Sequence, residues 1–278
     1  MEIKKNPTTP KRANQMNEDR GSYRDPAGQI FYHDEKVFRK INKEGQTRLE
    51  FLIQNNIIDE SIEKNYLIHS KKIIPQFEVE SGVEIYEHKK IPYISYPYEW
   101  SFTQLKLAAL HHLDFHLFLL EKEATLIDAS AYNIQFIGSK PIFIDLLSIK
   151  KYENGEYWNG HKQFCENFLN PLILKSKKGI NFNNWFKGNL EGIQTSELNN
   201  ILSIFDKFSF NIFTHVYLLN KLEESSKLKK NLKVKKNNKF FSKKNLISIL
   251  KQLKNFIIKL EDKKSVTIWQ DYSSNNTY

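Results

Sequence analysis

The sequence contains a single cysteine, Cys165, among its 278 residues. One cysteine excludes an intramolecular disulfide framework and argues against a cysteine-based zinc site, although His161 precedes it by four residues. No apolar run approaches the roughly 20 residues that cross a membrane. The amino terminus also lacks the apolar segment of a secretion signal. We therefore expect a cytoplasmic protein without a membrane span.

Acidic residues are too few to balance the basic ones, and the formal net charge is +10. The excess is local, because Lys221–Lys264 holds 15 lysines and 4 acids, whereas the rest of the chain is close to neutral. No arginine-rich or other nucleic-acid-binding motif accompanies these lysines, which argues against a nucleic-acid partner. We expect a helix with a solvated lysine face that packs on a neighbour, and a surface that docks a partner domain is the alternative.

The first hundred residues have the pattern of a small antiparallel sheet with one helix. Residues 1–20 are polar and without periodicity, which predicts a disordered arm. From Gly21 onward, turn residues separate short apolar runs, and two prolines near residues 92–98 exclude a helix there. The predicted strands cover 22–24, 29–32, 36–41, 73–79 and 83–87, the predicted helix covers 46–56, and the extended hinge covers 96–100. Residues 21–100 thus form the predicted amino-terminal lobe and hinge.

The pattern becomes mainly helical from residue 101 to residue 222. Ser101 can cap a long helix with a broad apolar stripe that runs to about Lys122. A β-hairpin is predicted over 134–144. Residues 223–264 are predicted to be a lysine-rich helical segment, with one amphipathic helix over 245–260. The tail, 265–278, shows no comparable pattern.

Asp128, Asn133 and Asp145 form the pattern with the clearest chemistry. Asp128 and Asn133 lie in the loop after the long helix, and Asp145 ends the predicted hairpin. Phosphoryl transfer uses such a set, since one Asp orients the attacking hydroxyl while an Asn and a second Asp hold magnesium against the nucleotide phosphates. The alternative is that Asp128 and Asn133 merely cap a turn.

This order of parts resembles the protein kinase-like superfamily, in particular its aminoglycoside phosphotransferase-like branch. The resemblance implies an α+β, two-lobed fold with a small antiparallel-sheet lobe and a mainly helical lobe. It also implies ATP and magnesium as cofactors, Asp128 as the catalytic base, and Asn133 and Asp145 as metal ligands. The chain departs from the pattern in lacking a glycine-rich phosphate loop, a His or Arg before Asp128, and a glycine after Asp145.

The residue that would anchor the nucleotide stays open at the level of the sequence. Lys40 and Arg39 on one predicted strand are the candidates, with Glu50 on the next helix as their partner. At the hinge, Tyr98 and its aromatic neighbours can stack on an adenine or sugar, or can pack between the lobes.

Four longer motifs resemble a bacterial family whose members carry the names SAM-dependent methyltransferase or NoeA-like nodulation protein. They are 94–106 (ISYPYEWSFTQLK), 128–136 (DASAYNIQF), 140–145 (KPIFID) and 162–169 (KQFCENFL). In that family this region is the amino-terminal module, and residues 265–278 resemble the linker to the methyltransferase domain. None of the ten glycines stands two residues from another, so no G-x-G turn is present and we expect no SAM site in this chain.

Three functional hypotheses follow from these resemblances. The first is a phosphotransferase that acts on a small molecule or glycan. The second is a non-catalytic nucleotide- or substrate-binding adaptor for a methyltransferase encoded nearby, and the third is a truncated member of the methyltransferase family.

Overall fold

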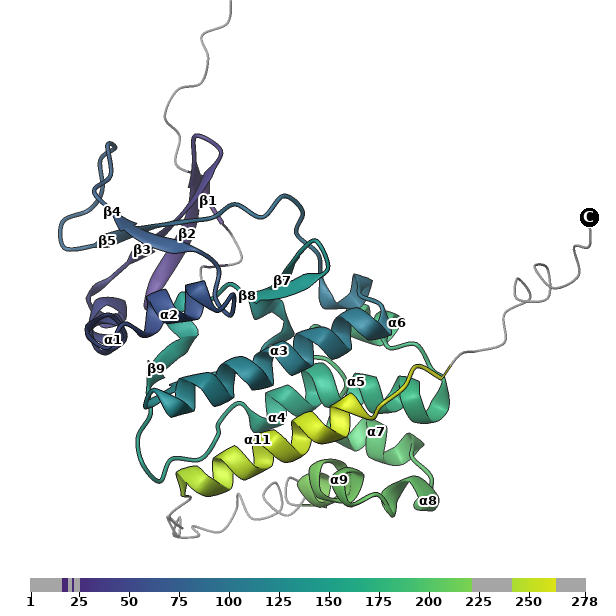
Figure 1. Cartoon of the computed structure of the whole chain (residues 1–278). Coiled ribbons are helices and arrows are strands. Elements are labelled where there is room, and N and C mark those ends of the chain that lie inside the picture. Colours follow the sequence, from purple (N-terminus) through teal and green to yellow (C-terminus); the bar gives the residue numbers. More distant parts are fainter. Residues whose placement is uncertain (1–16, 20–21, 23–25, 222–241, 264–278) are drawn as a thin grey trace, which may run out of the picture.

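Strands near the amino terminus form a five-stranded antiparallel sheet in the computed structural model, which describes residues 17–19, 22, 26–221 and 242–263 (Figure 1). Their order is β1-β2-β3-β5-β4. The tight turn between β2 and β3 places Asp34 and Glu35 at positive φ, as two-residue hairpin loops require. The strands are β1 (Asn17–Glu18), β2 (Gly28–His33), β3 (Lys36–Ile41), β4 (Ser70–Ile73) and β5 (Glu84–His88).

Two helices, α1 (Lys43–Gln54) and α2 (Ile57–Glu63), follow β3 and connect it to β4. Asn42 caps α1, because its side chain accepts hydrogen bonds from the backbone N–H groups of Glu44 and Gly45. Leu49 and Leu52 on the buried face of α1 belong to the main hydrophobic core. The sheet and its helices therefore form one end of a continuous core.

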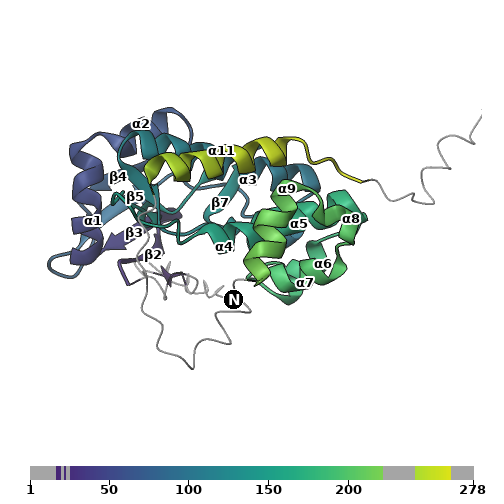
Figure 2. The ribbon, with the colours of Figure 1, turned by 90° about the horizontal axis from the view of Figure 1, so that it is seen from below.

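The long helix α3 (Phe102–Glu121) runs through the centre of the helical part (Figures 1 and 2). Ser101 and Gln104 form a capping box at its start. The other helices are α4 (His161–Phe164), α5 (Asn170–Ile173), α6 (Asn183–Gly188), α7 (Thr195–Ile201), α8 (Ile204–Lys207), α9 (Phe210–Ile212) and α11 (Lys243–Ile258), with π-helical turns η5 (Cys165–Leu169), η6 (Leu174–Lys178) and η7 (Phe213–Leu218). Four short strands lie between α3 and α4, namely β6 (Ala124–Leu126), β7 (Ile134–Ile137), β8 (Lys140–Phe143) and β9 (Ile149–Lys151).

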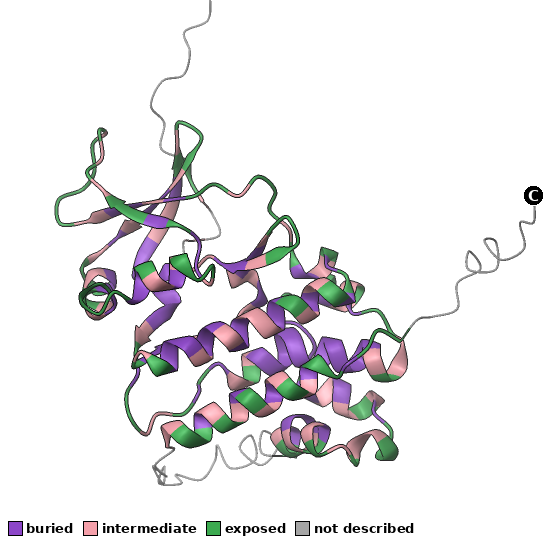
Figure 3. Cartoon of the chain, viewed as in Figure 1, coloured by how far each residue is buried: buried purple, intermediate pink, exposed green. Residues whose placement is uncertain are grey.

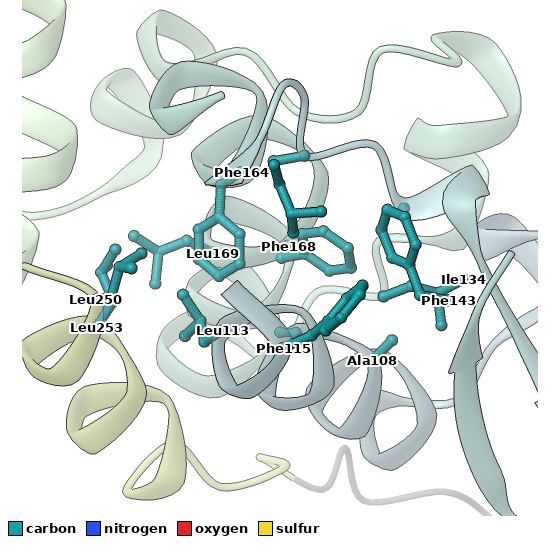
Figure 4. Packing of buried hydrophobic residues seen from close by; sticks show 14 of the residues in the cluster. Ala108, Leu113, Phe115, Ile134, Phe143, Phe164, Phe168, Leu169, Leu250 and Leu253 are labelled. Carbon is teal, nitrogen blue, oxygen red and sulfur yellow. The ribbon is translucent and has the colours of Figure 1, made fainter. Parts of the chain in front are cut away.

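One hydrophobic core extends from the underside of the sheet through α3 to α11 (Figure 3). In Figure 4, Leu250 and Leu253 of α11 point toward Leu113 of α3 and Leu169. A second, smaller cluster of Phe31, Phe38 and Ile85 covers the opposite face of the sheet. The sheet therefore has buried side chains on both faces, and β3 and β5 contribute to both clusters.

The α+β class is confirmed, and so are the strand over 36–41, the long helix that Ser101 caps, the 134–144 hairpin and the amphipathic carboxy-terminal helix. The described part of the lysine-rich segment is the helix α11, which packs on α3, as expected. Lys254 of α11 contacts Asp114 of α3 across that interface. The parts of the predicted arm, lysine-rich segment and tail at 1–16, 223–241 and 264–278 lie outside the described residues.

Several predicted boundaries were wrong. The first strand that pairs with β2 is Asn17–Glu18, inside the predicted arm. Ser22 is not in a strand, and residues 23–24 lie outside the described residues. The strand predicted over 73–79 is Ser70–Ile73, and it stops two residues before Pro75, which cannot donate to a ladder. The hinge is not fully extended, because Pro97–Glu99 form a 3₁₀ turn that proline at its first position permits.

Across the described residues, every helix is too short or too polar to traverse a lipid bilayer.

Replacing Leu250 by alanine is expected to lower the free energy of unfolding by about 2–5 kcal/mol, because its side chain is fully buried between α11 and the core. Urea unfolding measures this change. Lys251→Ala, at the exposed neighbouring position, is the matched control and should change stability by no more than about 0.5 kcal/mol. Equal stability of the two variants would contradict the packing of α11.

Candidate active site

A single segment of the chain, between the paired strands β6 and β9, contains Asp128, Asn133 and Asp145. These two strands pair with each other at its base, and the N–H of Ile127 donates to the carbonyl of Ser148 at 2.8 Å. Within this segment, the β7–β8 hairpin places Asn133 just before β7 and Asp145 just after β8. The N–H of Ile144 donates to the carbonyl of Asn133 at 2.9 Å. Residues twelve positions apart are therefore neighbours.

The helix α4 and the π-helical turn η5 hold the Asp128 loop from behind. The side-chain oxygens of Gln163 and Asn167 accept hydrogen bonds from the N–H groups of Ala129 and Ala131, at 2.9 and 3.0 Å. Gly160 fits against the same loop, since a β-carbon there would lie 3.1 Å from the carbonyl carbon of Asp128. The loop conformation is thus fixed by side chains on a separate helix.

Side-chain hydrogen bonds join the three residues through Ser148. The Asn133 Nδ2 donates to Asp128 Oδ1 at 3.0 Å, and it lies 3.4 Å from the Ser148 hydroxyl. That hydroxyl donates to Asp145 Oδ2. The structure therefore brings all three predicted residues into one polar group.

Arg39 of β3 reaches this group from the sheet. Its Nη1 lies 2.7 Å from Asp145 Oδ1, and the arginine is 7% exposed. Burial on its own raises the pKa of Asp145, but the guanidinium and the hydrogen bonds from Ser148 and Leu147 outweigh burial, so the pKa lies below its ordinary value. Asp145 is consequently a stable carboxylate whose charge Arg39 balances.

Asp128 has the opposite electrostatic character. Burial, together with the nearby charge of Asp145, raises its pKa to about 6, although hydrogen bonds from Ser148 and Asn133 partly offset the rise. A carboxyl group with a pKa near neutrality can take up and release a proton under physiological conditions, which is the property of a general base. Of the two aspartates, Asp128 is therefore the one suited to proton transfer.

Lys40 and Glu50 do not join the site. Lys40 lies on the other face of β3, where its ammonium pairs with Glu80 at 2.8 Å. Glu50 is exposed on α1, and within the described residues no ion pair connects it to Arg39 or Lys40. Arg39 pairs with Asp145 in the structure, and the partnership of Glu50 with Arg39 or Lys40 stays a prediction.

Tyr98 lies at the connection between the sheet and α3. Its ring stacks on that of Tyr96, with centroids 5.3 Å apart, and its carbonyl accepts a hydrogen bond from Asn183 at 3.0 Å. Trp100, by contrast, is buried against Phe136 and packs as core. Only the two tyrosines of this stretch keep exposed or half-buried rings.

The sheet lies close to the site loop at Gly28. A β-carbon on Gly28 would lie 2.9 Å from Leu147 Cδ1 and 2.5 Å from the Lys40 carbonyl, so only glycine fits. Three hollows of the described surface, the largest of about 770 Å³, have other linings, and none includes Asp128, Asn133 or Asp145. The start of β2 and the site loop are therefore in direct contact at Gly28.

Four further residues build the site, and three of them, Asn167, Ser148 and Arg48, were not predicted. Gln163 and Asn167 support the loop, Ser148 bridges the aspartates, and Arg48 of α1 donates to the Leu147 carbonyl at 2.8 Å. Gln163 and Asn167 are four residues apart, as a shared helix face requires, but nothing in the sequence indicates what that face contacts.

Comparison with known proteins gives a curated relative that matches most of the chain. No family model matches the chain. Nodulation protein NoeA of Rhizobium meliloti (strain 1021) is 39% identical over 264 residues, which are 93% of this chain and 55% of that protein. The chain thus spans about half the length of this curated relative. The predicted likeness to NoeA is confirmed.

Replacing Asp145 by asparagine is expected to lower the pKa of Asp128 from about 6, because the charge of Asp145 is one of the causes that raise it. Replacing Asn133 by alanine is expected to raise that pKa further, because the hydrogen bond from Asn133 favours the charged carboxylate. Carbon-13 NMR titration of the side-chain carboxyl groups measures both changes. Shifts in the same direction in the two variants would contradict the proposed arrangement.

Proposed function

We propose that this chain is a kinase-like module with a magnesium-dependent phosphotransferase site formed by Asp128, Asn133, Asp145 and Arg39. The observation that supports it best is the convergence of a strand arginine with an Asp-Asn-Asp group between an antiparallel sheet and a helical part. This is the set of charges that phosphoryl transfer needs. The sequence resemblance to the kinase-like superfamily points the same way.

The donor set suits magnesium. Asn133 uses its amide nitrogen toward Asp128, which leaves its Oδ1 to act as a ligand beside the carboxylate of Asp145. Oxygen donors of this kind are those that a hard cation prefers. When bound, magnesium and ATP would supply charge neutralisation and the phosphoryl group.

The chain's own residues then have separate roles. Asp128 orients the acceptor hydroxyl and takes its proton, which its pKa of about 6 allows near neutral pH. Arg39 supplies the positive charge for phosphate oxygens, and as an arginine it keeps that charge at any physiological pH. Ser148 holds the side chain of Asp145 in place.

The acceptor in this proposal is a hydroxyl of a small molecule or glycan, and the site of action is the cytoplasm. The name of the rhizobial relative connects that protein with nodulation, and we extend a part in the same process to this chain. The resemblance to methyltransferase-associated proteins adds a methyltransferase domain or protein as the proposed partner.

A non-catalytic binding module is the second candidate. It is favoured by the ion pair with Arg39, because a carboxylate whose charge is already balanced is a weaker ligand for magnesium. In this role the same polar group would hold a nucleotide or substrate for a methyltransferase without transferring phosphate.

Calorimetric titration with ATP and magnesium is expected to show 1:1 binding to the wild-type protein and its loss in Asp145→Ala and Arg39→Ala. Lys72→Ala is the matched control, because it removes an exposed ion pair with Glu84 from the same sheet and should leave binding unchanged. Binding that persists in both site variants would contradict the proposed nucleotide site. Absence of binding to the wild type would exclude it.

Asp128→Asn is expected to retain ATP binding but to slow ATP consumption by about 10²–10⁴-fold, the range for removal of a general base. Water serves as the surrogate acceptor, so that the acceptor's identity is not needed. Consumption that is equal in wild type and variant would contradict the role of Asp128. ATP binding without any consumption by the wild type would favour the binding module.

A further inference from the structure

His161, Cys165 and His215 form a second cluster of chemically capable side chains, apart from the Asp128 group. The His161 Nε2 lies 3.0 Å from His215 Nδ1 and 3.8 Å from Cys165 Sγ. One potential ligand atom from each residue lies within 4.8 Å of the others. We propose that these three side chains bind a zinc ion.

The distances fit a tetrahedral centre. With Zn–N bonds of about 2.0–2.1 Å and Zn–S bonds of about 2.3 Å, a tetrahedral site separates two nitrogens by roughly 3.3 Å and a nitrogen from the sulfur by roughly 3.6 Å. The separations of 3.0 and 3.8 Å are within a few tenths of an ångström of these values. Small side-chain movements therefore suffice to admit the ion.

The proposed ligands come from two helical segments that both contain a π-helical turn. His161 opens α4 and Cys165, four residues later, begins the π-helical turn η5, so that both lie on one helix face. His215 lies in a second π-helical turn, η7. π-Helical turns are rare and occur frequently at functional sites, because they shift the side chains of a regular helix. Both helical segments that supply the ligands carry this irregularity.

The burial of these side chains favours the binding of a metal ion. Cys165 and His215 are buried, and His215 Nε2 has no hydrogen-bond partner among the described residues. Burial favours the neutral imidazole, which is the form that ligates metals. Trp158 packs on the His161 ring at 5.5 Å between centroids and limits access of water from that side.

A nitrogen–nitrogen–sulfur set suits a borderline-soft ion such as Zn²⁺ better than Mg²⁺ or Ca²⁺, which prefer oxygen. Three protein ligands leave the fourth position for water or an external ligand. His161 is the least buried member of the set. The sequence concealed the site because His215 is 50 residues from Cys165.

The ion would also stiffen the support of the Asp128 loop. Gln163 and Asn167, which hold that loop, alternate along the same helix with His161 and Cys165. Zinc would tie this helix to η7, the segment that carries His215. The site is independent of phosphotransfer and can exist without it.

The full chain, stripped of metal with a chelator, is expected to bind one Zn²⁺ per molecule in calorimetric titration. Cobalt(II) in place of zinc should give the absorption of a tetrahedral thiolate complex, which the single cysteine assigns to Cys165 without ambiguity. Zinc should also raise the melting temperature of the wild type.

Cys165→Ala and His215→Gln are expected to weaken zinc binding by more than the roughly 10–100-fold that loss of an outer-shell partner costs. His69→Ala, at an exposed histidine outside the cluster, is the control and should bind as the wild type does. Wild-type protein that binds no zinc, or a cobalt spectrum without the thiolate absorption, would overturn the proposal. Unchanged affinity in Cys165→Ala would overturn it even if His215→Gln fails to fold.

Discussion

The buried ion pair between Arg39 and Asp145 is the contact on which the geometry of the site depends. It joins β3 of the sheet to the end of the β7–β8 hairpin, 106 residues away along the chain. Removing Arg39 would take away the ion-pair partner of Asp145, and breaking a buried pair in this way costs about 3–5 kcal/mol. The same pair holds the charge of Asp145 beside Asp128, so a residue of the sheet influences the pKa of Asp128.

The site loop is held from two directions. On the sheet side, Arg39 and Arg48 contact Asp145 and the Leu147 carbonyl. On the helical side, Gln163 and Asn167 bind the backbone that follows Asp128. A rigid scaffold that fixes a short polar loop is the common way in which folds position reactive side chains. The sheet and the helical part share one continuous hydrophobic core, so the contacts on the two sides of the loop are held in a fixed relation.

Local patterns predicted the elements, and contacts between distant elements decided the rest. Ser101 with Gln104, and Gly138 with its flanking apolar runs, mark a helix start and a hairpin through short-range chemistry, so both were found. The grouping of Asp128, Asn133 and Asp145 followed from the hairpin. The choice between Arg39 and Lys40 depended on which face of β3 turns toward the hairpin, and both faces carry apolar residues. The supporting residues and His215 escaped prediction because their partners are far away in sequence.

The close packing of Gly160 against the Asp128 loop has a consequence for the comparison of homologous sequences. A β-carbon at that position would lie 2.8 Å from Trp158 Nε1 and 3.1 Å from the carbonyl carbon of Asp128, so a larger residue would shift the indole or the loop. A homologue that retains every reactive side chain but carries a larger residue here would have a displaced loop. The residue at position 160 therefore reports on the shape of the Asp128 loop, which the identities of the aspartates alone do not.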